Sequence, residues 1–130
     1  MGVELSGPAK ELLDRKSFAV VSTIQPDGSP QSSVVWVTRD GDDILFSTVQ
    51  GRRKHLNLVR DPRISLVVNP PENPYEYVEV RGSATMTTEG GRELINELSR
   101  KYRGEEYGFD GPDDVRVVVR LSPRKVVGNI

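Results

Sequence analysis

Apolar and polar positions alternate along much of this chain with the two-residue period of half-buried β-strands. Three such segments come first, at Ser17 to Ile24, Gln31 to Thr38 and Ile44 to Val49. The sequences between them, Pro26-Asp27-Gly28 and Asp40-Gly41, are typical of tight turns. The pattern therefore predicts a three-stranded meander in the first half of the chain.

Three later segments also read as strands, and three stretches have a helical period. The strands are expected at Arg63 to Asn69, Tyr75 to Thr87 and Asp114 to Ser122, and the helices at Ser6 to Lys16, Gly51 to Arg60 and Glu89 to Arg103. Ser6 is the expected N-cap of the first helix, and Asp61-Pro62 ends the second. Six antiparallel strands with few helices predict a mostly β fold, a small closed barrel.

Length and composition narrow the picture further. The chain has 130 residues, 35% of them hydrophobic, which fits one domain over residues 1–130. It has no Cys and a single His, so we expect no disulfide, no thiolate nucleophile and no metal site built from Cys or paired His. The net charge of -1 argues against a nucleic-acid partner.

We expect no association with a membrane. No apolar run approaches the roughly 18 residues of a membrane span. The N-terminal segment also lacks the apolar core of an export signal, so we expect a cytoplasmic location.

The most informative stretch runs from Phe46 to Arg63. A strand ends in Ser47 and Thr48, a glycine follows, and the next helix opens with a cluster of cations, Arg52, Arg53 and Lys54. The N-terminus of a helix already attracts anions, so cations placed there cost stability unless an anion compensates them. The pattern predicts a phosphate cradle, although a solvated basic turn has the same residues.

Further candidates lie on strands. Alternation puts Gln31, Ser33 and Val35 on one face of their strand and Trp36 on the other. Gln31 and Ser33 can bond the polar edge of a flat heterocycle, or simply form an exposed strand face. Trp36, the only Trp, is more typical of a core or dimer-interface position than of a stacking partner for a ligand. The pair Tyr75 and Tyr77, after the rigid loop Pro70 to Pro74, can flank a ligand or pack.

Three segments carry a resemblance to a known family: AVVSTIQPDGSPQSSVVW, GRRKHLNLVRDPRISLVV and EVRGSATM. With them, nearly the whole chain from about Leu12 resembles the split β-barrel flavin-binding superfamily typified by pyridoxamine 5'-phosphate oxidase. It is most similar to the actinobacterial branch that uses the deazaflavin coenzyme F420 instead of FMN. The resemblance implies a split barrel of the FMN-binding type, with six antiparallel strands and flanking helices.

The resemblance also implies roles for particular residues. Arg52, Arg53 and Lys54 would bind the cofactor phosphate with help from Ser47 and Thr48, and Asn57 would lie near the phosphate side. The strand from Gln31 through Ser33 and Val35 to Trp36 would line the ring. Tyr75 and Tyr77 would border the cofactor from a neighbouring subunit, since members are homodimers with two sites at the interface.

The implied activity is that of an F420H2-dependent reductase, an oxidoreductase that passes a hydride to a small organic acceptor such as an enone, quinone or tetrapyrrole. Two alternatives stay open within the same fold: an FMN-binding oxidoreductase, and a coenzyme carrier without turnover. The carrier is kept because the sequence shows no acid/base constellation. The chain stops at Ile130, without the C-terminal pyridoxal-phosphate-binding motif of true pyridoxamine phosphate oxidases.

Overall fold

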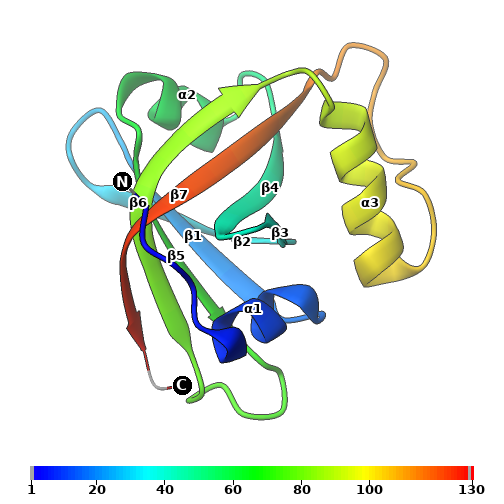
Figure 1. Cartoon of the computed structure of the whole chain (residues 1–130). Coiled ribbons are helices and arrows are strands. Elements are labelled where there is room, and N and C mark those ends of the chain that lie inside the picture. Colours follow the sequence, from blue (N-terminus) through cyan, green and yellow to red (C-terminus); the bar gives the residue numbers. More distant parts are fainter. Residues whose placement is uncertain (1, 129) are drawn as a thin grey trace.

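The computed structural model describes residues 2–128 and 130, which fold around one antiparallel sheet (Figure 1). The strands are β1 Phe18–Ile24, β2 Pro30–Val35, β3 Thr38–Asp40, β4 Asp43–Val49, β5 Arg63–Asn69, β6 Val78–Thr87 and β7 Arg116–Gly128. The helices are α1 Gly7–Asp14, α2 Arg53–Arg60 and α3 Gly91–Arg103. Across the sheet the order is β2, β1, β5, β6, β7, β4 and β3. The predicted mostly β fold with short helices is confirmed.

The number of strands and their closure differ from the prediction. The segment from Gln31 to Thr38 breaks after Val35, so the described residues form seven strands rather than six. β2 pairs with β1, whereas β4 pairs with β3 and β7, so the predicted three-stranded meander is wrong. β2 and β3 are the two edges of the sheet, which is therefore a split barrel and not a closed one.

Two side chains of α3 explain the break. The backbone N–H of Val37 donates to the hydroxyl of Tyr102 at 3.3 Å, and its carbonyl accepts from Nζ of Lys101 at 2.6 Å. Lys101 also donates to the carbonyl of Leu13, and Tyr102 to that of Ser17. The polar groups that a neighbouring strand would satisfy are thus satisfied by a helix. The chain can then pass from one edge of the sheet to the other.

The ends of the last two strands also differ from the prediction. β6 begins at Val78, so Tyr75 and Tyr77 lie in the preceding loop, where the N–H of Tyr75 bonds the side chain of Asn73. β7 continues to Gly128 because it pairs with β6 along almost its whole length. Ser6 caps α1 as expected, with its hydroxyl accepting from the N–H of Ala9.

The core fills the inside of the curled sheet, and the helices cover it from different sides. Inward positions of the strands supply the largest fully buried side chains, among them Phe46, Ile44, Leu66 and Leu121. In Figure 1, α1 lies at one end of the barrel, α2 at the opposite end, and α3 beside β7 and β4. Within residues 2–128 and 130, no helix is long and apolar enough to cross a membrane.

A glycine permits the irregular pairing of the two longest strands. The register of β6 and β7 shifts between Arg81 and Gly82, where Arg124 is the extra residue of a bulge. A Cβ atom on Gly82 would overlap the carbonyl oxygen of Ser122. The strands therefore approach each other here more closely than a side chain allows.

We predict that Gly82→Ala lowers the free energy of unfolding by about 1–3 kcal/mol, because the backbone must move to admit the methyl group. Urea unfolding of the variant and the unaltered protein measures the difference. Gly108→Ala is the control, since a Cβ atom there meets nothing within 4 Å. Equal stability of the two variants would contradict the prediction.

Candidate functional site

A cavity of about 240 Å³ lies where the barrel is split, between the end of β2 and the end of β4. The start of α2 and the start of β7 form further walls, and α3 with the loop 104–115 closes one side. Its lining residues are Val34, Val35, Trp36, Ser47, Thr48, Arg52, Lys54, Ile95, Leu98, Tyr107 and Arg116. The cavity thus combines an apolar side with a hydroxylated and basic side.

Half of the residues predicted from the sequence meet in this cavity. They are Val35, Trp36, Ser47, Thr48, Arg52 and Lys54. Strand β4 brings the two hydroxyl groups to its end, and the glycine turn at Gly51, with φ of 94°, leads straight into the basic start of α2. Four of the five residues of the predicted phosphate cradle, Ser47, Thr48, Arg52 and Lys54, therefore line one cavity.

Among the described residues, the basic start of α2 has neither an acidic residue in its first turn nor an ion-pair partner. Arg52 is the N-cap and makes no side-chain capping bond, and the first turn contains no acidic residue. In the part of the chain that the structure describes, no carboxylate forms an ion pair with Arg52 or Lys54. Partial burial, together with the charge of Arg52, lowers the pKa of Lys54. Cations, free N–H groups and the helix dipole all favour an anion here.

Three buried polar atoms near the split lack a hydrogen-bond partner among the described residues: Oγ of Ser33, Oγ1 of Thr48 and Oδ1 of Asn57. Thr48 and Asn57 are almost completely buried. Burying a polar group without a partner costs about 1–3 kcal/mol, so such groups are usually matched by water or a ligand. Of the three residues only Thr48 lines the cavity, where its hydroxyl and the basic start of α2 together suit a phosphate group.

Arg116 and Tyr107 are cavity residues that the sequence analysis missed. The guanidinium of Arg116 bonds the carboxylate of Asp110, with Nη2 to Oδ1 at 2.6 Å, and donates to Oγ of Ser47 at 3.3 Å. It also lies 4.7 Å from the ring centre of Tyr107. Arg116 occupies an outward position of β7 that the loop 104–115 and the start of α3 cover. Strand alternation alone therefore predicts an exposed residue at this position.

Trp36 belongs to an aromatic cluster. Its ring stacks on Tyr102 with centres 5.5 Å apart and meets Tyr107 edge to face at 6.1 Å. Tyr107 continues the cluster to Phe109, with ring centres 5.4 Å apart. The apolar wall of the cavity is therefore held by packing from both α3 and the loop 104–115.

The other predicted site residues lie outside the cavity. Arg53 is exposed on α2. The side chain of Asn57 turns inward and donates from Nδ2 to Oγ1 of Thr23 at 3.0 Å. Gln31 is half-buried on β2, where its Oε1 accepts from the same hydroxyl at 3.5 Å. Ser33 is half-buried on the same strand.

The two tyrosines of the loop before β6, Tyr75 and Tyr77, are exposed. Their loop lies at the α1 end of the barrel, opposite α2 (Figure 1). Within a single chain they are thus not brought to the cavity.

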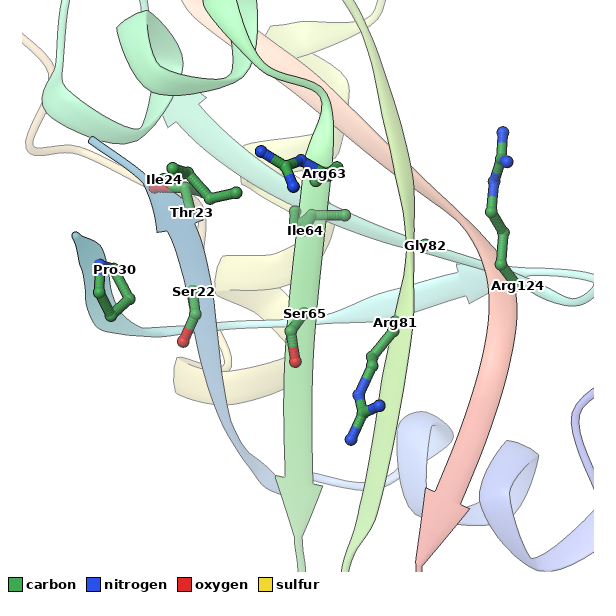
Figure 2. A pocket seen from close by; sticks show the side chains of 10 residues that line it. All are labelled: Ser22, Thr23, Ile24, Pro30, Arg63, Ile64, Ser65, Arg81, Gly82 and Arg124. Carbon is green, nitrogen blue, oxygen red and sulfur yellow. The ribbon is translucent and has the colours of Figure 1, made fainter. Parts of the chain in front are cut away.

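A second cavity, of about 420 Å³, lies on the outer side of the sheet and is mostly apolar (Figure 2). Arg63, Arg81 and Arg124 border it, but their side chains point in different directions. Arg63 bonds the carboxylate of Asp61, which lowers the pKa of Asp61 to about 2, and Arg81 bonds that of Glu79. Because these arginines do not converge, the smaller cavity is the better candidate for the principal site.

Comparisons with known proteins agree with this geometry. The family model described as pyridoxamine 5'-phosphate oxidase matches residues 5–128. A solved structure named F420 reductase is 27% identical, with a TM-score of 0.82 over 95% of this chain and 98% of that chain. A conserved hypothetical protein from Mycobacterium tuberculosis is 23% identical, with a TM-score of 0.76 over 96% of this chain and 84% of that one.

General stress protein 26 from Bacillus anthracis has the same fold, with 16% identity and a TM-score of 0.67 over 89% of this chain and 86% of that one. The family match spans nearly every residue that builds the split barrel and its cavity. The chain belongs to the pyridoxamine 5'-phosphate oxidase family, whose fold is that of flavin-binding oxidoreductases.

Proposed function

We propose that this protein is an F420H2-dependent reductase that transfers a hydride between the deazaflavin coenzyme and a small organic acceptor such as an enone, quinone or tetrapyrrole. The observation that carries the proposal is the cavity at the split, where Arg52 and Lys54 open a helix without any carboxylate partner among the described residues. The similarity to a structure named F420 reductase supports the choice of coenzyme.

The residues present fit such a coenzyme. Arg52 and Lys54, with the hydroxyls of Ser47 and Thr48, would hold its phosphate. Trp36, Ile95 and Leu98 offer the apolar surface that a flat ring requires, and the unpartnered oxygen of Ser33 lies on β2, the strand that leads into Trp36. When bound, a deazaflavin supplies hydride transfer at its ring carbon. The protein then has to bind, orient and shield the ring.

FMN is the alternative cofactor, because it presents a phosphate and a flat ring to the same groups. We would test the choice by titrating the purified protein with F420 and with FMN, following Trp36 fluorescence and cofactor absorbance. Our proposal expects tight F420 binding, weak FMN binding and oxidation of F420H2 by at least one acceptor of the three classes. Tight binding without turnover would favour a coenzyme carrier, and a preference for FMN would refute the assignment to F420.

We predict that Lys54→Ala weakens coenzyme binding by about 1–3 kcal/mol, because a charge-assisted contact to the phosphate is lost. Arg53→Ala is the matched control, since Arg53 precedes Lys54 on the helix, carries the same charge and does not line the cavity. Fluorescence titration of both variants, with circular dichroism as a check of folding, measures the effect. An equal loss in both would show that general surface charge and not the cavity binds the phosphate.

We also propose a homodimer formed through the outer face of β2, β1 and β5. Val20 on this face is opposite Val34 on one neighbouring strand and Val67 on the other, and Phe18 lies further along β1. Phe18, Val20 and Val34 are exposed, Val34 by 71%. Apolar side chains gathered on one face favour self-association. Since Val34 also lines the cavity, a second copy here would border the coenzyme.

Light scattering should accordingly report a dimer for the unaltered protein and a monomer for Val34→Glu, because a buried charge in the interface lacks a partner. Val59→Glu is the control, since Val59 is 65% exposed but lies on α2. A monomeric unaltered protein that binds coenzyme tightly would contradict the proposed assembly.

A further inference from the structure

One acidic side chain stands beside the cationic cavity. Asp110 lies in the loop before β7, and its side chain is only 3% exposed. Both of its oxygens accept from Nε of Arg116, at 3.1 and 2.9 Å, and Oδ1 also accepts from Nη2. The side chain of Arg116 is 6% exposed and forms part of the cavity wall. The cavity is therefore bordered by a buried, hydrogen-bonded ion pair.

The charged groups around Asp110 come from every element that packs against it. Arg116 belongs to β7, and Arg92 of α3 has its Nη1 3.5 Å from Oδ2 of Asp110. Arg52, at the start of α2, is close enough to contribute to the low pKa of Asp110, which the hydrogen bonds of Arg116 mainly cause. Asp110 is thus ionised at neutral pH and feels the same cations that face the cavity.

A carboxylate in this position changes how strongly the cavity favours a ligand with two negative charges over a ligand with one. Without it, Arg52, Lys54 and Arg116 would present three unpaired positive charges to a ligand. With it, the charge of Arg116 is balanced, and a second negative charge on the ligand gains less from the wall. Buried and partly buried charges are screened weakly by salt, so this difference reaches the bound ligand.

We propose that Asp110 is a specificity-determining residue: by pairing with Arg116, it reduces the advantage of a doubly charged phosphomonoester over a singly charged phosphodiester. This inference rests on the proposed function, in which the cavity holds the coenzyme phosphate. FMN ends in a phosphomonoester, whereas the phosphate of F420 is a diester. The pair would therefore help the cavity to accept F420 in competition with FMN.

The test uses ligands that share the ring and differ in their phosphate group. For both riboflavin and its deazaflavin counterpart, the free ribityl compound, its 5'-phosphate and the methyl ester of that phosphate are titrated against the protein by Trp36 fluorescence. The quantity compared is the affinity of the 5'-phosphate divided by that of its methyl ester. We expect Asp110→Asn to raise this ratio about tenfold, while affinity for the free ribityl compound stays unchanged.

Asp113→Asn is the matched control, because Asp113 is an exposed carboxylate of the same loop that does not line the cavity. It should leave the ratio at the value of the unaltered protein. An unchanged ratio in Asp110→Asn, or the same rise in Asp113→Asn, would overturn the proposal. Since Asp110→Asn leaves Arg116 buried without its partner, folding is checked by near-ultraviolet circular dichroism.

If that variant does not fold, Arg116→Gln replaces it. Asp110 then keeps Arg92 as a partner, and the ratio should fall about tenfold, because the cavity loses a positive charge while the carboxylate stays. An unchanged ratio would overturn the proposal. Failure of the proposed function looks different: flavin ligands would show the Asp110 effect, while F420 itself, titrated as described above, would not bind. Binding of none of the ring compounds would overturn both.

Discussion

The break between β2 and β3 depends on hydrogen bonds that come from a helix rather than from a strand. Lys101 and Tyr102 bind the carbonyl and the N–H of Val37, and so stand in for a neighbouring strand at the point where the sheet would otherwise close. The same two side chains hold the backbone of Leu13 and Ser17. One turn of α3 thus ties together the end of α1, the start of β1 and the crossing chain.

The cavity follows from this arrangement. Because β2 and β4 do not pair, their ends stay apart, and residues of five elements (β2, β4, α2, α3 and β7) and of the segments between them line the space. Trp36 lies in the segment between β2 and β3, and its ring stacks on Tyr102 of α3. The helix that binds the backbone of this segment thus also positions Trp36 in the cavity wall. The geometry that splits the barrel is therefore also the geometry that supplies a binding site.

Charge in the site is arranged in two ways. The start of α2 concentrates positive charge without internal partners, which suits an external anion. Another part of the wall is formed by Arg116, whose charge is balanced by the buried carboxylate of Asp110 and which donates to the hydroxyl of Ser47. The unpaired cations of α2 attract a ligand anion. The paired Arg116 forms part of the cavity wall and adds little net positive charge to it. Unpaired and paired cations thus border the same cavity.

The sequence by itself determined where most of the strands lie, the helix boundaries to within a few residues, and the basic turn after Ser47 and Thr48, because periodicity, turn residues and capping act over a few neighbouring positions. It also carried the family resemblance, which the match over residues 5–128 bears out. Only the tertiary structure decided that the strand through Trp36 breaks, since its partners on α3 lie over 60 positions away. Burial of Arg116 and Asp110 likewise needed the folded loop, because an outward strand position becomes a cavity wall only when another segment covers it.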